Sequence, residues 1–223
     1  VRGMTEGQGV ELSERCAVIA TGFGSPLARD FWPVPKQNVL SGCQMIVRAP
    51  DIKEIEVFTG KFLGHGGFGW LVPWRDGYAL TGLLTRKHTV SLMYSLVEKL
   101  QSEGRIEGTE EQFYCRPIPL GTPTTTYKEG MVGVGDAVGQ VKPTSGGGIY
   151  YALLAADCAG KVIGDSLMAN DLSAANLKRY DDEWQAILSK EISQGVMLRS
   201  ALERLPDEMG EVLHRMIGVP FVR

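Results

Sequence analysis

The feature that most constrains the fold of this 223-residue chain is a short apolar stretch that runs into Gly135-Asp136, followed further on by three consecutive glycines, 146–148. Residues 130–135 predict a short buried strand, and residues 148–163, rich in small side chains, predict a helix. Consecutive glycines cost conformational entropy unless the backbone must approach something closely. Because the first N–H groups of a helix lack partners within it, they attract negative charge. The sequence therefore predicts a strand, a loop and a helix start suited to a flat, partly anionic ligand.

Short apolar runs separated by turn signals predict an antiparallel sheet in the first half of the chain. The Asp76-Gly77 pair predicts a hairpin between the last two of these runs. Residues 89–103 carry apolar side chains at helical spacing, so we expect one helix to cover the sheet. The predicted strands are 39–47, 55–59, 69–73, 78–84 and, after the helix, 112–119.

The two remaining segments are expected to complete the fold. Residues 9–21 predict a buried strand that enters a glycine-rich turn ending at Pro26, and this segment is expected to meet residues 130–163 in space. Residues from Ser173 onward predict a long helical region, broken before Pro206 and followed by a short helix.

Composition excludes some classes of protein. Lys and Arg total 23 against 26 for Asp and Glu, so the net charge of -3 gives no reason to expect a nucleic-acid partner. No stretch approaches the roughly 18 apolar residues of a membrane-spanning helix. We expect a cytoplasmic protein, with peripheral membrane contact through an apolar patch left open.

The four cysteines, Cys16, Cys43, Cys115 and Cys158, are widely spaced. They contain no C-x-x-C pair, which argues against a zinc site and against a dense disulfide framework, and a reducing compartment is expected. Cys43 and Cys115 fall in predicted strands, where they are either redox partners or separate buried thiols. Separate buried thiols are the expectation.

The run from Gly135 to Tyr151 resembles the second flavin-binding motif of the geranylgeranyl reductases, a group within the hydroxybenzoate-hydroxylase-like flavoproteins. Residues 16–25 resemble a strand and turn of that family, although Phe23 stands where an acidic residue is customary. Residues 67–74, with Gly77 and Gly82, resemble the aromatic strand pair of its substrate domain. Residues 177–184 resemble its carboxyl-terminal helical region.

This resemblance implies FAD as the cofactor, with Asp136 accepting hydrogen bonds from the ribityl or pyrophosphate region. The alternative for Asp136 is a helix or turn cap, and Lys142 is equally well explained as an exposed loop cation. The residues that the resemblance assigns to the cofactor are Gly135, Asp136, Gly139, Lys142, Pro143, Gly146, Gly147, Gly148 and Ile149.

The resemblance also implies an isoprenoid substrate, for which Phe68, Trp70 and Trp74 would line an apolar tunnel. Ordinary core packing is the alternative for each of these aromatic residues. His65 is a weak candidate for proton donation, and neither His88 nor His214 stands at metal-ligand spacing from it, so no metal site is expected. No catalytic residue is assigned.

The expected fold class is α+β: an antiparallel substrate-domain sheet with a covering helix, a remnant of an α/β FAD-binding domain, and a carboxyl-terminal helical region. The corresponding ranges are 1–33 with 127–165 for the flavin-binding remnant, 34–126 for the substrate domain and 166–223 for the helical region. The family's amino-terminal unit, in which a strand, a G-x-G-x-x-G turn and a helix bind the ADP half of the dinucleotide, is not found at the start of the sequence. We therefore expect a carboxyl-terminal portion that is inactive by itself.

Three functions fit the sequence. The first is an FAD-dependent reductase of carbon-carbon double bonds in a geranylgeranyl-type lipid, with NAD(P)H or ferredoxin as electron donor. The second is a flavin-dependent monooxygenase or halogenase of the same fold. The third is a non-catalytic module that binds an apolar ligand or a partner protein.

Overall fold

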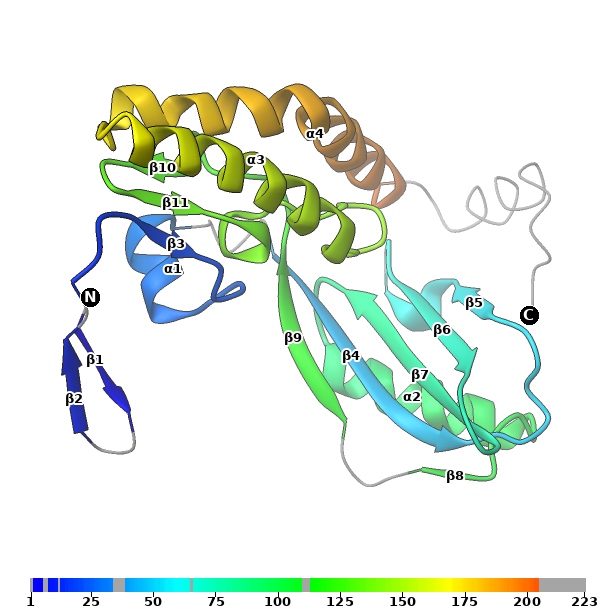
Figure 1. Ribbon diagram of the computed structural model, residues 1–223. Coiled ribbons are helices and arrows are strands. Elements are labelled where there is room, and N and C mark those ends of the chain that lie inside the picture. The colour runs from blue at the N-terminus through cyan, green and yellow to red at the C-terminus, as the bar shows by residue number, and fades with distance from the viewer. Residues whose placement is uncertain are drawn as a thin grey trace. The chain divides into compact units, whose positions relative to one another are not determined.

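The computed structural model describes residues 2–5, 8–11, 13–33, 39–64, 66–109 and 113–204. The chain forms two compact units, which are described separately (Figure 1). The first unit comprises residues 1–34, 121–141 and 147–192, and the second comprises 35–120, 142–146 and 193–223. The loop 142–146, which includes the first glycine of the triplet, therefore belongs to the second unit, whereas the segments on both sides of it belong to the first.

The first unit contains a small sheet in which β3 (Ala17–Ile19) pairs in parallel with β11 (Met131–Gly133), and β11 pairs with β10 (Tyr127–Lys128). Val18 lies opposite Val132, so the expected meeting of these two segments is confirmed. The prediction of one long strand over 9–21 is wrong. Its first part is β2 (Gln8–Glu11), which pairs with β1 (Arg2–Thr5) in a separate hairpin.

Three helices belong wholly or partly to the first unit. The short α1 (Pro26–Phe31) begins where the Ser25 side chain accepts a hydrogen bond from the Ala28 N–H. The predicted helix over 148–163 is α3 (Ile149–Met168), which is longer than expected and is followed by Asn170 in the left-handed conformation that commonly ends a helix. The long helical region is α4 (Ala174–Leu202). The predicted helix after Pro206 lies outside the described residues.

Helices α3 and α4 pack together over β11 to form the core of the first unit (Figure 1). Small residues on α3, Ala155 and Ala159, let the large side chains of α4 come close, among them Tyr180 and Trp184, which are fully or almost fully buried. The other core residues of this unit include Val132, Tyr151, Val162, Leu177, Leu188 and Ile192.

A buried carboxylate fixes α4 to the segment before β10. Asp181 accepts hydrogen bonds from the N–H of Thr126 at 3.2 Å, from the Thr126 hydroxyl and from the indole N–H of Trp184 at 3.0 Å. Only 4% of Asp181 is exposed, so these donors replace the water that the carboxylate loses on folding.

Replacement of Asp181 by Ala is expected to lower the free energy of unfolding by about 3 kcal/mol, because buried donors on Thr126 and Trp184 lose their acceptor. Asp182→Ala is the matched control, since Asp182 is exposed and pairs with Lys178 on the helix surface. That variant should stay within about 0.5 kcal/mol of the wild type. Urea unfolding followed by circular dichroism measures both, and equal effects would contradict this account.

The second unit is built on an antiparallel sheet with strand order β5-β6-β7-β4-β8, and β9 also pairs with β4. The predicted sheet is confirmed, and so is the hairpin at Asp76-Gly77, where both residues have positive φ. Helix α2 (Thr89–Ser102) covers one face of the sheet (Figure 1). The strands are β4 (Val39–Arg48), β5 (Glu56–Thr59), β6 (Phe68–Pro73), β7 (Tyr78–Thr85), β8 (Gly108–Thr109) and β9 (Tyr114–Pro119), with a 3-10 turn at Lys61–Leu63.

The expectation that Cys43 and Cys115 are separate thiols is wrong. They lie directly opposite each other in the antiparallel pair of β4 and β9, and they form a disulfide. The spacing of the cysteines in the sequence did not predict that they lie opposite each other, because 72 residues separate them. Cys16 and Cys158 are free thiols. Within the described part of the chain, no helix is long and apolar enough to cross a membrane.

Candidate functional site

The candidate site in the first unit begins where β11 ends. Gly135–Val138 form a single 3-10 turn, which directs the Asp136 carboxylate toward the start of α3. A Cβ atom at Gly148 would overlap the Asp136 Oδ1 atom, so glycine is required at that helix start. Burial raises the pKa of Asp136 above its ordinary value, because desolvation disfavours the charged form.

A hydrogen-bonded pair, Gln140 and Tyr180, holds this turn in place. The Gly135 N–H donates to Gln140 Oε1 at 2.7 Å, and Gln140 Nε2 donates to the Tyr180 hydroxyl at 3.0 Å. That hydroxyl donates in turn to the Gly133 carbonyl at 2.7 Å. Both side chains are fully buried. Sequence reasoning missed them as site residues, because nothing in the chain indicates that a tyrosine on α4 faces the loop after β11.

The beginning of α3 is open to solvent. Gly147 is exposed, and Ile149 and Tyr150 have 82% and 67% of their surfaces exposed. Gly139, also predicted to bind the cofactor, is buried instead and lies so close to the Gly121 carbonyl that a side chain would overlap it. The structure therefore places Asp136, Gly148 and Ile149 together at the helix start, whereas Gly139 shapes the turn beneath.

The loop 142–146 belongs to the second unit. Gly146 has a φ of 73°, and a Cβ there would lie 3.2 Å from Ile118 and 3.3 Å from Leu84, so the loop rests on the sheet. Pro143 is buried against Gly195 of α4, and Lys142 is exposed.

A buried arginine secures this loop, and no pattern in the sequence indicated its role. Arg199 of α4 donates to the carbonyls of Thr144 at 3.2 Å and Gly66 at 3.0 Å, and more distantly to that of Pro143 at 3.4 Å. Glu203 accepts from Arg199 and from Arg86, which balances the buried charge. Burial lowers the pKa of Arg199 from its ordinary value.

The sheet face opposite α2 carries aromatic side chains beside the loop. The ring centroids of Phe68 and Trp70 lie 5.8 Å apart, and Trp70 covers Gly82, where a side chain would overlap its ring. Alternation along β6 puts Leu71 on the other face, under α2. The apolar cluster on the aromatic face consists of Leu40, Phe68, Trp70, Leu84, Ile118 and Leu120.

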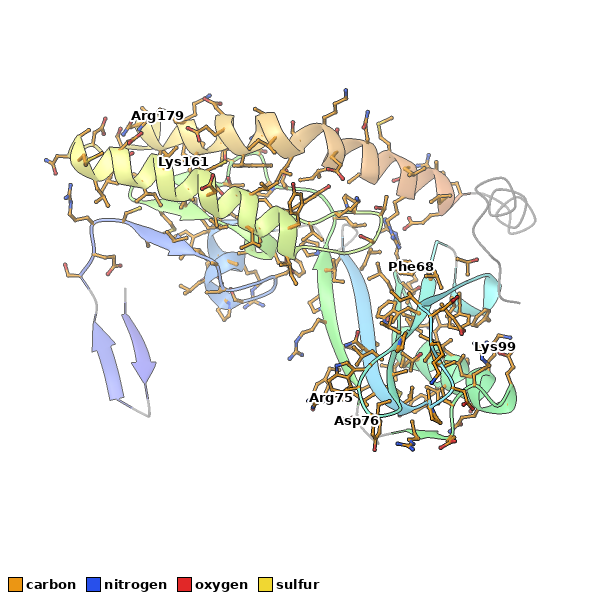
Figure 2. The ribbon with its side chains drawn as sticks, turned by 45° about the vertical axis from the view of Figure 1, so that its right-hand side comes forward. Phe68, Arg75, Asp76, Lys99, Lys161 and Arg179 are labelled. Atoms are coloured by element: carbon orange, nitrogen blue, oxygen red, sulfur yellow. A yellow bond between two sulfur atoms is a disulfide. The ribbon has the colours of Figure 1, made fainter. Side chains whose placement is uncertain are left out.

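Trp74, also predicted to bind substrate, is not part of that cluster. It follows β6, is 45% exposed, and its ring lies 4.6 Å from the Arg75 guanidinium. Figure 2 shows Phe68 and the turn residues Arg75 and Asp76 at opposite ends of the sheet. His88 precedes α2 and is exposed, whereas His65 and His214 lie outside the described residues.

Each unit by itself has some of the features that FAD binding requires. The first unit offers a half-buried carboxylate beside a helix start that tolerates no side chain at Gly148. The second offers a loop fixed by Arg199 against an apolar face. A carboxylate can accept hydrogen bonds from a polyol, and helix N–H groups favour negative charge.

Comparison with known proteins agrees with these features. No protein-family model matches the chain. A digeranylgeranylglycerophospholipid reductase of Methanopyrus kandleri is 35% identical over 187 residues, which cover 78% of this chain and 50% of the relative. One of the same name from Methanocaldococcus jannaschii is 26% identical over 95% of this chain and 57% of its own length. The chain thus spans about half the length of these relatives.

Solved structures share the fold. A geranylgeranyl bacteriochlorophyll reductase-like protein of Thermoplasma acidophilum matches with a TM-score of 0.86 and 17% identity, over 97% of this chain and 57% of that one. A probable FAD-dependent monooxygenase of Pseudomonas aeruginosa matches with a TM-score of 0.61 and 18% identity, over 89% and 58% respectively.

The strand, the acidic turn and the glycine-opened helix are carried by an α+β fold that the chain shares with this reductase-like protein and with the probable FAD-dependent monooxygenase. In sequence, the chain is similar to digeranylgeranylglycerophospholipid reductases over three quarters or more of its length.

Replacement of Asp136 by Asn should make the chain more stable at neutral pH. A carboxyl whose pKa is raised on folding contributes stability below its unfolded pKa and loses it as pH rises through its folded pKa. Asn stays neutral, so the stability advantage of the variant should grow as pH rises from about 4, the ordinary value for Asp. Unfolding curves at a series of pH values test this, and an unchanging difference would count against a buried carboxyl.

Gly148→Ala is expected to destabilise the chain by about 2 kcal/mol, because the added methyl group overlaps Asp136. Gly160→Ala, in the same helix but with open space around it, should instead stabilise the chain by about 0.5–1 kcal/mol. Thermal and urea unfolding of both variants provide the comparison. Equal stabilisation by the two substitutions would show that Asp136 does not approach Gly148.

Proposed function

We propose that the protein to which this chain belongs is an FAD-dependent reductase of carbon-carbon double bonds in a geranylgeranyl-type isoprenoid lipid. The names of its relatives support this reaction, since several are digeranylgeranylglycerophospholipid reductases. The proposed partners are an isoprenoid substrate and an electron donor such as NAD(P)H or ferredoxin.

The observation that carries the proposal is the contact of Gly146 with Ile118 and Leu84 on the aromatic face of the sheet. This contact lies within one unit and joins the loop of the flavin motif to an apolar surface. An isoprenoid chain offers hydrocarbon and almost no polar groups, so its recognition depends on such a surface.

The residues would divide the work as follows. Asp136 would accept hydrogen bonds from the cofactor, and the first N–H groups of α3 would favour negative charge on it. FAD, when bound and reduced, supplies hydride. Phe68 and Trp70 would orient the hydrocarbon and exclude water. The hydrogen bonds that Arg199 donates to backbone carbonyls would keep the loop 142–146 in place.

The rival reaction is oxygen-dependent hydroxylation or halogenation, which the fold similarity to a probable FAD-dependent monooxygenase supports. The two reactions differ in their co-reactant. A reductase works without oxygen, whereas a monooxygenase consumes oxygen while the electron donor is oxidised.

The test is to express the full product of the gene that contains this chain, measure its flavin absorbance, and incubate it anaerobically with digeranylgeranylglycerophospholipid and dithionite. Hydrogenated lipid detected by mass spectrometry is the expected result. A flavin-free protein, or turnover that requires oxygen, would refute the proposal.

Aromatic variants locate the substrate surface in the same assay. Trp70→Ala should raise KM by about tenfold or more, because it removes a large apolar contact. Trp74→Ala is the comparison, since Trp74 lies beside Arg75 and outside the aromatic cluster, and this change should alter KM less than about twofold. Circular dichroism checks that both variants fold. A larger effect at Trp74 would instead indicate that the substrate binds at the hairpin end of the sheet.

A further inference from the structure

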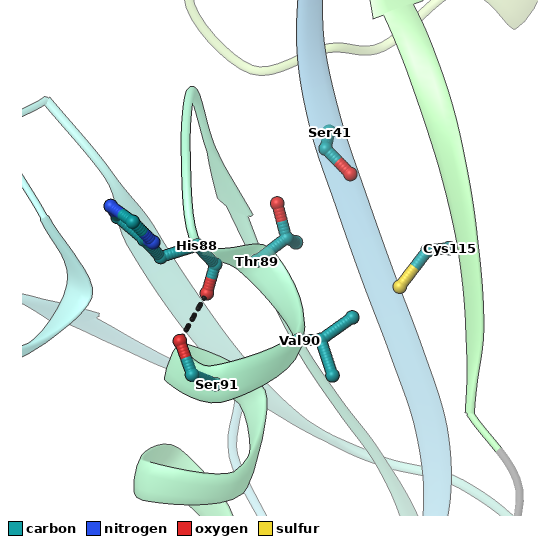
Figure 3. A pocket seen from close by; sticks show the side chains of 6 residues that line it. All are labelled: Ser41, His88, Thr89, Val90, Ser91 and Cys115. Atoms are coloured by element: carbon teal, nitrogen blue, oxygen red, sulfur yellow. Dashed lines mark hydrogen bonds between the residues drawn. The ribbon is translucent and has the colours of Figure 1, made fainter.

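The disulfide between Cys43 and Cys115 differs in its surroundings at its two ends. Cys43 is fully buried in the core between the sheet and α2. Cys115 is partly exposed and lines a cavity of about 450 Å³, together with Ser41 and the first residues of α2, as Figure 3 shows. A molecule from solvent therefore reaches the bond from the Cys115 side.

The disulfide ties an edge strand to the sheet. In the described part of the chain, β9 pairs only with β4. The Cα atoms of the two cysteines lie 4.1 Å apart, which is typical of a narrow, non-hydrogen-bonded pair. Pro117 and Pro119 stand at equivalent positions of the pair, two and four residues after Cys115. An N–H group at these positions would point to the free edge of β9 and not to β4. The two prolines therefore remove no hydrogen bond from the pairing of β9 with β4.

The strand that the disulfide holds also forms part of the aromatic face. Ile118 of β9 packs in the cluster with Phe68 and Trp70, and it lies against Gly146. A change in how β9 is held to the sheet would therefore directly affect the packing of this aromatic face.

The cavity suits a thiolate. His88 makes no side-chain capping hydrogen bond to α2, and its carbonyl accepts from Ser91 instead (Figure 3). The first residues of the helix, Thr89 and Val90, line the cavity, and the positive end of a helix favours negative charge on a nearby sulfur.

We propose that the Cys43–Cys115 disulfide is a redox-sensitive modification site, which a small dithiol opens in the folded protein by attacking Cys115. A thiolate of the dithiol bonds to Cys115 Sγ, the protein disulfide breaks, and the Cys43 sulfur leaves and takes up a proton. The second thiolate of the dithiol then displaces Cys115. The protein gains two thiols, and the dithiol is oxidised to a disulfide. Cys43 remains as a small buried thiol, which a core accommodates.

The test uses the full chain with Cys16 and Cys158 replaced by Ser, so that only this pair reacts. The protein, purified in air, is incubated with dithiothreitol in native buffer, alkylated at intervals with iodoacetamide and analysed by mass spectrometry. We expect reduction without unfolding, with Cys115 in the first mixed disulfide. After reduction, amide hydrogen exchange should rise in residues 114–119.

Two tryptophan variants separate attack through the cavity from general unfolding. Val90→Trp fills the cavity and should slow reduction by about tenfold, because exchange rates depend on access to the attacked sulfur. Glu98→Trp, on the same helix outside the cavity, should leave the rate unchanged. In guanidinium chloride all forms should react equally fast. Free thiols in the protein purified in air, reduction only after denaturation, or no effect of Val90→Trp would each overturn the proposal.

Discussion

The first unit depends on the hydrogen bonds that the Tyr180 side chain makes beneath the turn after β11. A chain that leaves a strand and turns sharply exposes backbone groups that the strand can no longer satisfy. Gln140 and Tyr180 satisfy those of Gly133 and Gly135 within the core. With the turn fixed in this way, Asp136 remains half-buried beside Gly148, at a free-energy cost reflected in its raised pKa. Such a cost is typical of residues retained for function.

The second unit uses the two faces of one sheet for different purposes. One face is covered by α2 and forms a conventional core, to which Cys43 and Leu71 contribute. The other carries Phe68 and Trp70 and contacts Gly146 of the loop 142–146. Strand alternation produces this division, because neighbouring residues in β6 point to opposite faces. The hydrogen bonds from Arg199 to the carbonyls of Thr144 and Gly66 then hold the loop on the aromatic face.

Local patterns in the sequence predicted the elements well and the contacts between them poorly. The Asp76-Gly77 hairpin followed from turn chemistry, and the meeting of β3 with β11 followed from the family resemblance, although its parallel orientation was not predicted. The Cys43–Cys115 disulfide and the roles of Tyr180 and Arg199 depend on register and on helix packing between distant segments. Spacing along one chain carries no information about such pairings. The resemblance to flavoproteins drew attention to the glycine triplet, and the closeness of Asp136 explains why Gly148 cannot carry a side chain.

The most direct test is the dissociation constant of FAD from the full gene product, measured by flavin fluorescence for the wild type and for Asp136→Ala. If the carboxylate holds the cofactor, the variant should bind FAD about a hundredfold more weakly, as expected for loss of charge-assisted hydrogen bonds. The fold should be retained, since the change removes a buried charge. Equal affinity in the two proteins would contradict the assignment of Asp136 and the glycine-opened helix as a flavin site.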